Sequence, residues 1–242
     1  NMADEYILET HQLTKRFGGV HAVEDVNFRL RRGELRCVIG PNGAGKSTFF
    51  KMITAQLKPS EGRITFEGKD ISGAERHVIS RLGIGIKNQV PDVFDGISTR
   101  ENIWAAARFR HNSKNVEQIV DRVLSQMNLT AVADDLVGEL SHGQRQWVEF
   151  GMVMSLEPKI ILLDEPTAGM PADETDRTAN LILEINATTP IIVVEHDMQF
   201  IRKIANIVTV LHQGKILTED TMANIQQNQT VLDVYLGQSG RA

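Results

Sequence analysis

Short runs of apolar residues recur along the chain and predict a buried parallel sheet. Residues 35–39, 160–163 and 191–194 are such runs. A short segment with apolar side chains at successive positions fits a strand that is buried on both faces. Residues 35–57 and 157–217 alternate these segments with helical patterns. We therefore expect a parallel sheet with helices packed against it.

Two other segments alternate apolar and polar residues. Residues 6–33 and 62–68 have this pattern, which is typical of strands with one buried face. Turn residues separate the expected strands: Gly18-Gly19, Arg32-Gly33, Glu61-Gly62 and Glu67-Gly68. We expect these strands to form an antiparallel sheet beside the parallel one.

Residues 89–156 have a mostly helical pattern. A polar loop at 111–115 precedes six apolar residues at helical spacing, which predict one buried stripe: Val116, Ile119, Val120, Val123, Leu124 and Met127. Trp104 and Trp147 are expected to pack inside this helical region, because tryptophan is highly buried on average.

Two further local patterns come from the same pass along the chain. Ser141 is expected to be the N-cap of a helix over residues 142–156, because serine hydroxyls accept hydrogen bonds from helix N–H groups. Residues after about 220 are expected to form a short polar tail. No internal repeat is visible in the sequence.

The segment that follows the first apolar run has the pattern G-x-x-x-x-G-K-[ST] of a phosphate-binding loop. Glycines let the backbone curl so that N–H groups point at phosphate oxygens, and a following helix adds its positive end. Lysine supplies a charge for the β- and γ-phosphates, and the serine hydroxyl can bind Mg²⁺. The motif alone indicates ATP or GTP binding. Its residues are Gly40, Pro41, Asn42, Gly43, Ala44, Gly45, Lys46, Ser47 and Thr48.

A strand is expected before this loop. A helix is expected to begin at about Gly45 and to continue through the helix-like stretch at residues 48–56. A second candidate site follows the strand at 160–163, where Asp164 and Glu165 end the apolar run. The carboxyl ends of parallel strands are where such folds bind ligands. Asp164 is placed to hold Mg²⁺ and Glu165 to accept a proton from an attacking water. The alternative is that both acids cap the next turn; the phosphate loop upstream favours chemistry.

The ordered set of remaining motifs resembles one family. The sequence L-S-H-G-Q at residues 140–144 resembles the L-S-G-G-Q signature of ATP-binding-cassette (ABC) ATPases. His196 resembles the switch histidine of that family, and Gln89 resembles its glutamine loop. Phe17 resembles the aromatic residue that stacks on adenine, although it could instead fill the sheet core. The resemblance covers residues 6–237.

The resemblance implies a fold, an α/β P-loop NTPase. It has a RecA-like parallel-sheet core, an antiparallel β subdomain and a helical subdomain. The implied single domain spans residues 5–237, with the nucleotide core at about 5–88 and 157–237. The helical signature subdomain is at about 89–156.

The resemblance also implies a mechanism of ATP hydrolysis with ATP and Mg²⁺. Glu165 would activate water, His196 would stabilise the transferring phosphoryl group, and Lys46 would bind phosphates. Mg²⁺ would be held by Ser47, Gln89 and Asp164. A second subunit in a head-to-tail dimer would close on the nucleotide with Ser141, Gly143 and Gln144.

Two positions depart from the common family pattern. His142 stands where glycine is usual in the signature, so its side chain must fit near the partner's nucleotide or point away. Pro171 stands where many members have aspartate, and it has neither a carboxylate nor an N–H. That change puts a cross-dimer hydrogen bond in doubt, although Asp173 is close in sequence.

These departures, with the segments at 140–147, 168–170 and 231–237, resemble the hydrophobic-amino-acid uptake branch of ABC importers. Within that branch they resemble the ATP-binding subunit of urea importers, which implies urea or short-chain amides as the solute. The implied partners are membrane permeases, a second and possibly different ATPase subunit and, indirectly, a solute-binding protein. A branched-chain amino-acid importer and an exporter are the alternatives within transport.

Composition agrees with this interpretation. A chain of 242 residues is long enough for one large α/β domain, and a formal net charge of -5 does not suggest a nucleic-acid partner. Cys37, the single cysteine, is expected in the core, which excludes a disulfide framework and fits a reducing compartment. Residues 1–5 are polar and acidic, and no apolar run approaches the roughly 20 residues of a membrane span.

We therefore expect a cytoplasmic protein that reaches the cytoplasmic face of the membrane through a partner. Two other classes of protein fit the sequence less well. A non-transport ABC ATPase that serves DNA repair or the ribosome usually has long insertions or two cassettes in one chain. A P-loop kinase needs an acceptor pocket and a lid, and has no use for a signature helix.

Overall fold

The computed structural model describes residues 5–112 and 115–236, and its larger sheet has the order β10-β9-β3-β8-β7-β6. The strands pair in parallel except β10, which is antiparallel to β9. The predicted parallel sheet is confirmed. Its strands are β3 (Leu35–Ile39), β6 (Ile84–Lys87), β7 (Ile160–Asp164), β8 (Ile191–Val194), β9 (Ile207–His212) and β10 (Lys215–Thr221).

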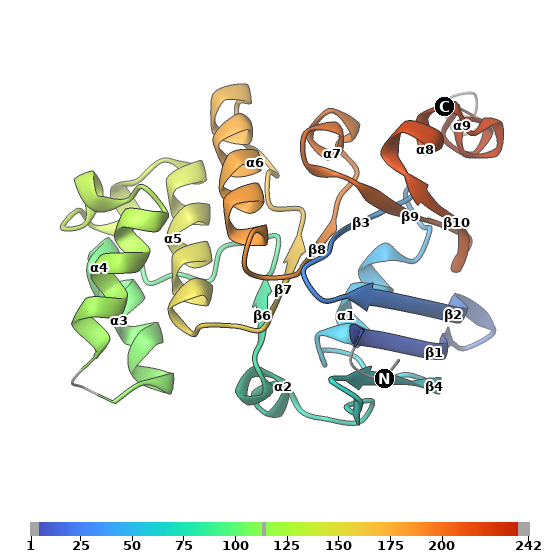
Figure 1. Cartoon of the computed structure of the whole chain (residues 1–242), viewed down its shortest axis with the longest axis horizontal. Coiled ribbons are helices and arrows are strands. Elements are labelled where there is room, and N and C mark those ends of the chain that lie inside the picture. The colour runs from blue at the N-terminus through green and yellow to red at the C-terminus, as the bar shows by residue number, and fades with distance from the viewer. Residues whose placement is uncertain (1–4, 113–114, 237–242) are drawn as a thin grey trace.

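The predicted antiparallel sheet is also confirmed, with the order β2-β1-β4-β5. It lies beside the larger sheet (Figure 1). Phe28 of this sheet packs edge-on against Phe49 of α1, with ring centroids 5.4 Å apart. Its strands are β1 (Tyr6–Phe17), β2 (Val20–Arg31), β4 (Glu61–Phe66) and β5 (Lys69–Asp70), and α1 is Lys46–Ile53.

Three helices between β6 and β7 gather at one end of the long axis of the molecule (Figure 1). They are α3 (Thr99–Arg110), α4 (Val116–Gln126) and α5 (His142–Ser155), and α2 (Arg76–Leu82) precedes β6. Single 3₁₀ turns at Thr130–Val132 and Val137–Glu139 connect α4 to α5. The predicted stripe from Val116 to Met127 is buried in full. Of the polar loop predicted at 111–115, residues 113–114 lie outside the described residues.

Ser141 caps α5 as predicted. Its hydroxyl accepts a hydrogen bond from the Gln144 N–H, while the Gln144 side chain accepts one from the Ser141 N–H. This reciprocal capping box satisfies two donors that a helix otherwise leaves unpaired. The start of the signature segment is therefore fixed by its own sequence.

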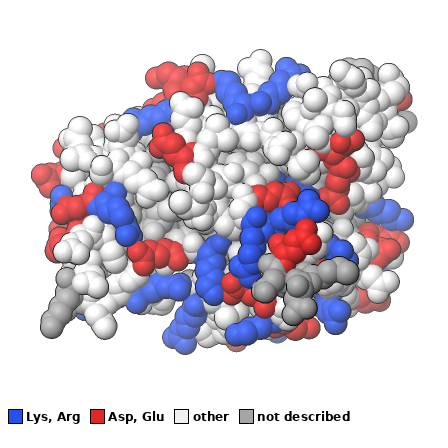
Figure 2. Space-filling view, viewed as in Figure 1, with Lys and Arg blue, Asp and Glu red and all other residues white. Residues whose placement is uncertain are grey.

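Charged side chains of both signs share the face shown in Figure 2, where Lys and Arg lie among Asp and Glu. Glu67 is one centre of such pairing, since it forms ion pairs with Arg32 and with Lys159.

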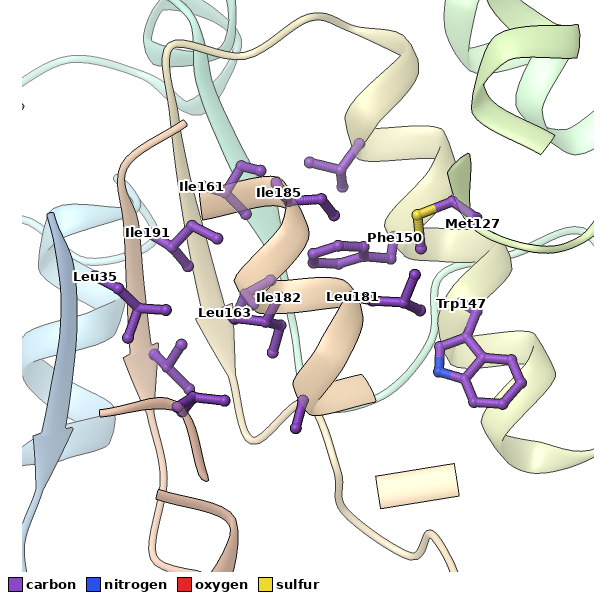
Figure 3. Packing of buried hydrophobic residues seen from close by; sticks show 14 of the residues in the cluster. Leu35, Met127, Trp147, Phe150, Ile161, Leu163, Leu181, Ile182, Ile185 and Ile191 are labelled. Atoms are coloured by element: carbon purple, nitrogen blue, oxygen red, sulfur yellow. The ribbon is translucent and has the colours of Figure 1, made fainter. Parts of the chain in front are cut away.

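Helix α6 (Ala172–Asn186) packs between the larger sheet and α5 (Figure 3). Ile182 and Ile185 of α6 belong to the same buried cluster as Ile161 of β7 and Phe150 of α5. Trp147 of α5 is also buried there, as predicted, and its indole N–H donates to the Thr178 hydroxyl at 2.9 Å. The helical region is thus joined to the sheet through α6. Cys37 is buried, as expected from its strand.

The prediction for Trp104 is wrong, because its side chain is 41% exposed. Ile103 and Ala107 are buried, so the buried stripe of α3 runs beside Trp104 rather than through it. Arg108, one turn along, lies over the Trp104 ring with its guanidinium carbon 5.8 Å from the ring centroid. The positions of the apolar residues around the helix predict the exposure of Trp104 better than the average burial of tryptophan does.

The predicted polar tail after residue 220 is also wrong. The chain forms α8 (Met222–Gln227) and α9 (Gln229–Leu236) after α7 (Met198–Ile204) and β10. Met222, Ile225 and Val231 are buried in the main cluster, so a few spaced apolar residues suffice to anchor these short helices. Gly237, the end of the predicted domain, lies outside the described residues.

Candidate active site

The phosphate loop joins β3 to α1 and lines a cavity of about 420 Å³. Gly43 and Gly45 have left-handed backbone with φ of 81° and 104°. A Cβ at Gly45 would also lie 2.6 Å from the Ala22 carbonyl oxygen. Both the conformation and the lack of space therefore require glycine at residue 45.

Helix α1 begins at Lys46, as predicted, and ends at Ile53, three residues before the predicted end at residue 56. Ala55 has left-handed backbone, which breaks the helix. No side chain caps the first N–H groups of α1. Those donors, together with the helix dipole, are available to an anion in the cavity.

Lys46 places its ammonium group at the base of the loop. Nζ donates to the Gly40 carbonyl and, at 3.3 Å, to the Pro41 carbonyl. Burial lowers the pKa of Lys46, while the charges of Glu165, Glu195 and Asp164 act in the opposite direction. A cation held only by backbone carbonyls can turn to phosphate oxygens with little loss.

A second wall of the cavity comes from residues that the sequence analysis did not single out. Val20, His21 and Ala22 of β2 line it, together with Gln213 and Gly214 of the turn between β9 and β10. The Gly214 N–H donates to the Ala44 carbonyl at 2.9 Å, which ties this turn to the phosphate loop. The Gln213-Gly214 pair signals a turn, but nothing in the sequence places that turn against the loop.

Asp164 and Glu165 follow β7 at the edge of the sheet where the phosphate loop also lies. Burial, Glu165 and Glu195 raise the pKa of Asp164 to about 6. Glu165 lines the cavity and has left-handed backbone with φ of 45°, held by a 2.9 Å hydrogen bond from its N–H to the Val194 carbonyl. Such backbone is unfavourable for a residue with a Cβ and tends to occur where geometry serves function.

His196 lies beside Glu165. Its Nδ1 is 3.0 Å from Glu165 Oε1, and its side chain is 60% exposed. His196 follows β8, and Glu165 follows the neighbouring β7, so adjacent strand ends bring the two side chains together. The capping alternative does not account for this position of Glu165.

The sequence analysis did not assign a role to Glu195, which is buried between these groups. Its carboxylate accepts hydrogen bonds from the Thr167 hydroxyl and from the His196 and Asp197 N–H groups. Burial raises the pKa of Glu195, and these donors oppose the shift. Glu195 therefore fixes the segments after both β7 and β8. The available signal for Glu195 in the sequence was a single acidic residue at the end of the apolar run 191–194.

The acidic cluster fits a divalent cation bound with phosphate. The charges of Glu165 and Glu195 raise the pKa of Asp164, and Ser47 lines the same cavity as Glu165. Within residues 5–112 and 115–236, no set of three His, Cys, Asp or Glu side chains forms a metal cage. Mg²⁺ suits this arrangement, since it usually takes one or two carboxylates plus substrate phosphates.

Some predicted site residues are not brought to this cavity. Phe17 is 50% exposed, with Lys15 Nζ 5.4 Å from its ring centroid, so it does not fill the sheet core. Gln89 is exposed in the loop at residues 88–97, named the Gln89 loop below, and its carbonyl accepts a hydrogen bond from Gln146. Neither residue lines the cavity.

The signature residues also lie away from the chain's own phosphate loop. Ser141, Gly143 and Gln144 are at the start of α5 and do not line the cavity. The Ser141 hydroxyl donates to Glu174 of α6 at 2.9 Å, and a Cβ at Gly143 would overlap the Glu174 carboxylate. A side chain at residue 143 would therefore have to displace the Glu174 carboxylate.

The structure shows the surroundings of His142 and Pro171, the two residues that depart from the common family pattern. His142 turns toward the segment after β7, with Nε2 2.9 Å from the Ala168 carbonyl oxygen. Pro171 is the N-cap residue of α6, without a side-chain cap, and Asp173 is exposed in the first turn of that helix.

Within the part of the chain that the structure describes, no helix is long and apolar enough to cross a bilayer.

Known proteins resemble this chain in sequence and in fold. The profile of the family described as "ABC transporter" matches residues 23–168. The high-affinity branched-chain amino acid transport ATP-binding protein BraF of Pseudomonas aeruginosa is 32% identical over 251 residues, which covers 96% of this chain and 98% of that protein. The lipopolysaccharide export ATP-binding protein LptB of Acidithiobacillus ferridurans is 31% identical over 233 residues, 96% of this chain and 97% of LptB.

Among solved structures, the ADP conformation of the ATP-binding cassette MJ1267 superposes with a TM-score of 0.86 at 29% identity. The match covers 96% of this chain and 99% of that cassette. The fold and the site define an ABC ATPase cassette, a member of the P-loop NTPases. The chain belongs to the ABC transporter family, as an ATPase subunit.

The acidic cluster generates a prediction about the nucleotide-free protein. Because the pKa of Asp164 is raised to about 6, the ionised carboxylate disfavours the folded state. The penalty is complete above that pKa and disappears as the pH falls toward the ordinary value. In chelator, Asp164→Asn should melt above wild type at about pH 8, and the difference should shrink toward about pH 5.

Thermal unfolding at both pH values measures this difference, with Glu184→Gln, an exposed carboxylate on α6, as the matched control. An Asp164→Asn protein that melts below wild type at the higher pH would show that the ionised carboxylate stabilises the fold.

Proposed function

We propose that the chain hydrolyses ATP at the cavity of the phosphate loop and thereby powers solute import through a membrane permease. One observation supports the site above all others. The phosphate loop, Lys46 and Glu165 line one cavity, and His196 is 3.0 Å from the Glu165 carboxylate. These are the parts that phosphoryl transfer to water needs: a phosphate cradle, a cation and a base.

Glu165 is the general base in this proposal. A base must lie within hydrogen-bond reach of the water that it deprotonates, and Glu165 opens onto the cavity. The His196 ring holds the carboxylate in place before ATP binds, and the ring would turn to the γ-phosphate when the nucleotide enters. Lys46 would leave the Gly40 and Pro41 carbonyls for the β- and γ-phosphates.

Mg²⁺ would be held by Ser47 and Asp164, with Gln89 reaching the same ion after movement of its loop. When bound, the ion neutralises charge on the β- and γ-phosphates. Phe17 is the proposed adenine contact. Its exposure at the end of β1 leaves a ring face free for stacking.

ATP-binding subunits of ABC transporters act as dimers on membrane permeases. We propose a head-to-tail dimer in which Ser141, Gly143 and Gln144 meet the partner's nucleotide. Their position outside the chain's own cavity supports a role toward another subunit. The interface could be with a different ATPase subunit. The predicted division, a nucleotide core at 5–88 and 157–237 with a signature region at 89–156, belongs to the same proposal.

The permease is proposed to dock on the Gln89 loop and α3. Val90 and Phe94 of the loop and Trp104 of α3 are exposed apolar side chains. Asn102 joins the two elements, because its side-chain amide exchanges hydrogen bonds with the backbone of Phe94. Docking there would place the chain on the cytoplasmic face of the membrane, with a solute-binding protein acting on the opposite side. No nucleic-acid partner is proposed.

Urea or a short-chain amide is the proposed solute, from the resemblance of residues 140–147 and 168–170. Branched-chain amino acids are the second candidate, because BraF, named for them, is 32% identical along almost the whole chain. An ATPase subunit of this kind does not touch the solute, so the cavity does not discriminate between them.

Replacement of Glu165 tests the catalytic part of the proposal. Glu165→Gln should bind Mg·ATP with the affinity of wild type but hydrolyse it at least about a hundred-fold more slowly, because an amide cannot accept the proton of water. Binding calorimetry and phosphate release in the assembled transporter measure the two effects. Glu184→Gln, exposed on α6, is the control. Hydrolysis by Glu165→Gln at the control rate would remove Glu165 from the role of base.

Uptake by cells tests the solute. Deletion of the gene should abolish accumulation of radiolabelled urea and leave leucine uptake unchanged, and Glu165→Gln should fail to complement the deletion. Loss of leucine uptake with normal urea uptake would instead assign the chain to the branched-chain amino-acid class.

A further inference from the structure

A buried ion pair connects the Gln89 loop to α5, and the hydrolysis mechanism above does not use it. Lys87, the last residue of β6, lies 3.2 Å from the Glu149 carboxylate, and their side chains are only 2% and 7% exposed. Burial of two charges is costly unless each is paired and fully hydrogen-bonded. The sequence analysis did not single out either residue.

The Lys87 ammonium group has a partner for each of its three donors. It donates to the Glu149 carboxylate, to the Gln146 side-chain carbonyl and, at 3.1 Å, to the Asn88 carbonyl. Gln146 is also buried. Lys87, Gln146 and Glu149 are named the Lys87 cluster below.

The cluster holds the backbone of the Gln89 loop at two points. The Gln146 amide donates to the Gln89 carbonyl at 3.1 Å, and the Asp92 backbone N–H lies beside the Glu149 carboxylate, where it counteracts the rise in the Glu149 pKa that burial causes. These two contacts flank residues 90–91, where the loop turns outward. The position of the loop backbone is therefore set by one face of α5 as well as by the sheet.

The same face of α5 reaches the segment after β7. His142, Gln146 and Glu149 are four and three residues apart, so they lie along one stripe of the helix. His142 contacts the Ala168 carbonyl at 2.9 Å, and its Nε2 is 3.4 Å from the Gln146 amide. One stripe of α5, the helix that begins with the signature, thus contacts both the Gln89 loop, which follows β6, and the segment that follows β7.

Stability alone is a weak reason for such a pair. Replacement of a buried ion pair by apolar side chains of similar size is often neutral or stabilising, whereas loss of one partner is strongly destabilising. What apolar side chains cannot supply is the hydrogen bond to the Gln89 carbonyl and the polar contact with the Asp92 N–H. A more exposed pair, Arg145–Asp95 at 2.7 Å, joins the same helix and loop farther along.

We propose that Lys87, Gln146 and Glu149 are positioning residues that lock the Gln89 loop to the signature helix, so that a change at one is transmitted to the other. This proposal rests on the proposed function, in which the loop meets the permease and α5 meets the partner's nucleotide. In it, these three side chains transmit structural change between the permease contact of the loop and the nucleotide contact of α5.

The test compares hydrogen exchange in the full chain with and without Mg·ATP. Lys87→Met/Glu149→Met removes both charges at once and keeps similar volume. The variant should melt close to wild type and bind Mg·ATP within about threefold of the wild-type affinity. Its Asp92 amide should exchange at least about ten-fold faster. In wild type, Mg·ATP should slow exchange in the first turn of α5, and in the variant this response should be at least about threefold smaller.

Arg122→Met/Glu157→Met is the matched control, since that exposed ion pair lies in the helical region and contacts neither loop. It should leave both exchange measurements at their wild-type values. If the double variant of the cluster does not fold, Gln146→Met decides on the same measurement, because it removes the donor to the Gln89 carbonyl.

The outcomes are distinguishable. If wild type does not bind Mg·ATP, the proposed function fails. If it binds and shows no response in α5, or if the folded cluster variant keeps both the wild-type response and the wild-type exchange at Asp92, the positioning role is overturned. Loss of the response with retained binding supports it.

Discussion

The ends of three neighbouring parallel strands determine the site. β3, β8 and β7 are adjacent in the larger sheet, and each continues into a functional segment at the same edge. The phosphate loop follows β3, Glu195 and His196 follow β8, and Asp164 and Glu165 end β7. Because strand spacing is fixed at about 4.8 Å by the hydrogen-bond ladder, these groups are within reach of one another without any long-range loop. The remaining features adjust that arrangement.

The adjustment is mainly electrostatic. Three carboxylates share a partly buried region. Burial and the charges of Glu165 and Glu195 raise the pKa of Asp164 to about 6, and burial raises the pKa of Glu195. The charges of Lys51 and Lys87 act against the shift of Asp164. Lys46 is held by backbone carbonyls rather than by a carboxylate. The carboxylates leave this region short of positive charge, and the N-terminal end of α1 beside it attracts anions. The site therefore favours a ligand that carries both positive and negative charge. A metal-bound polyphosphate is such a ligand.

The fold and the centre of the site could be predicted from the sequence because their signals are local. Successive apolar residues identified β7 and β8, and the glycine-lysine pattern identified the loop before α1. The antiparallel sheet and the buried stripe of α4 followed from periodicity. Trp104 and α8–α9 were mispredicted, since the orientation of a helix and the anchoring of a weakly apolar segment depend on what packs against them.

Other parts of the site could not be found in this way because they are made by contacts distant in sequence. Gln213 and Gly214 reach the loop through the β9–β10 turn, and Glu195 becomes important only because Thr167 and the His196 N–H surround it. The Lys87 cluster is likewise invisible until β6 and α5 lie side by side. Phe17 and Gln89 were predicted from resemblance, and their roles stay predictions.

The most direct test of this account is the structure of the Glu165→Gln protein crystallised with ATP and Mg²⁺. The account predicts phosphates within the loop from Gly40 to Thr48, with Lys46 Nζ moved from the Gly40 and Pro41 carbonyls to the β- and γ-phosphates. The metal should lie beside Ser47 and Asp164. A nucleotide bound elsewhere, with Lys46 still on those carbonyls, would contradict it.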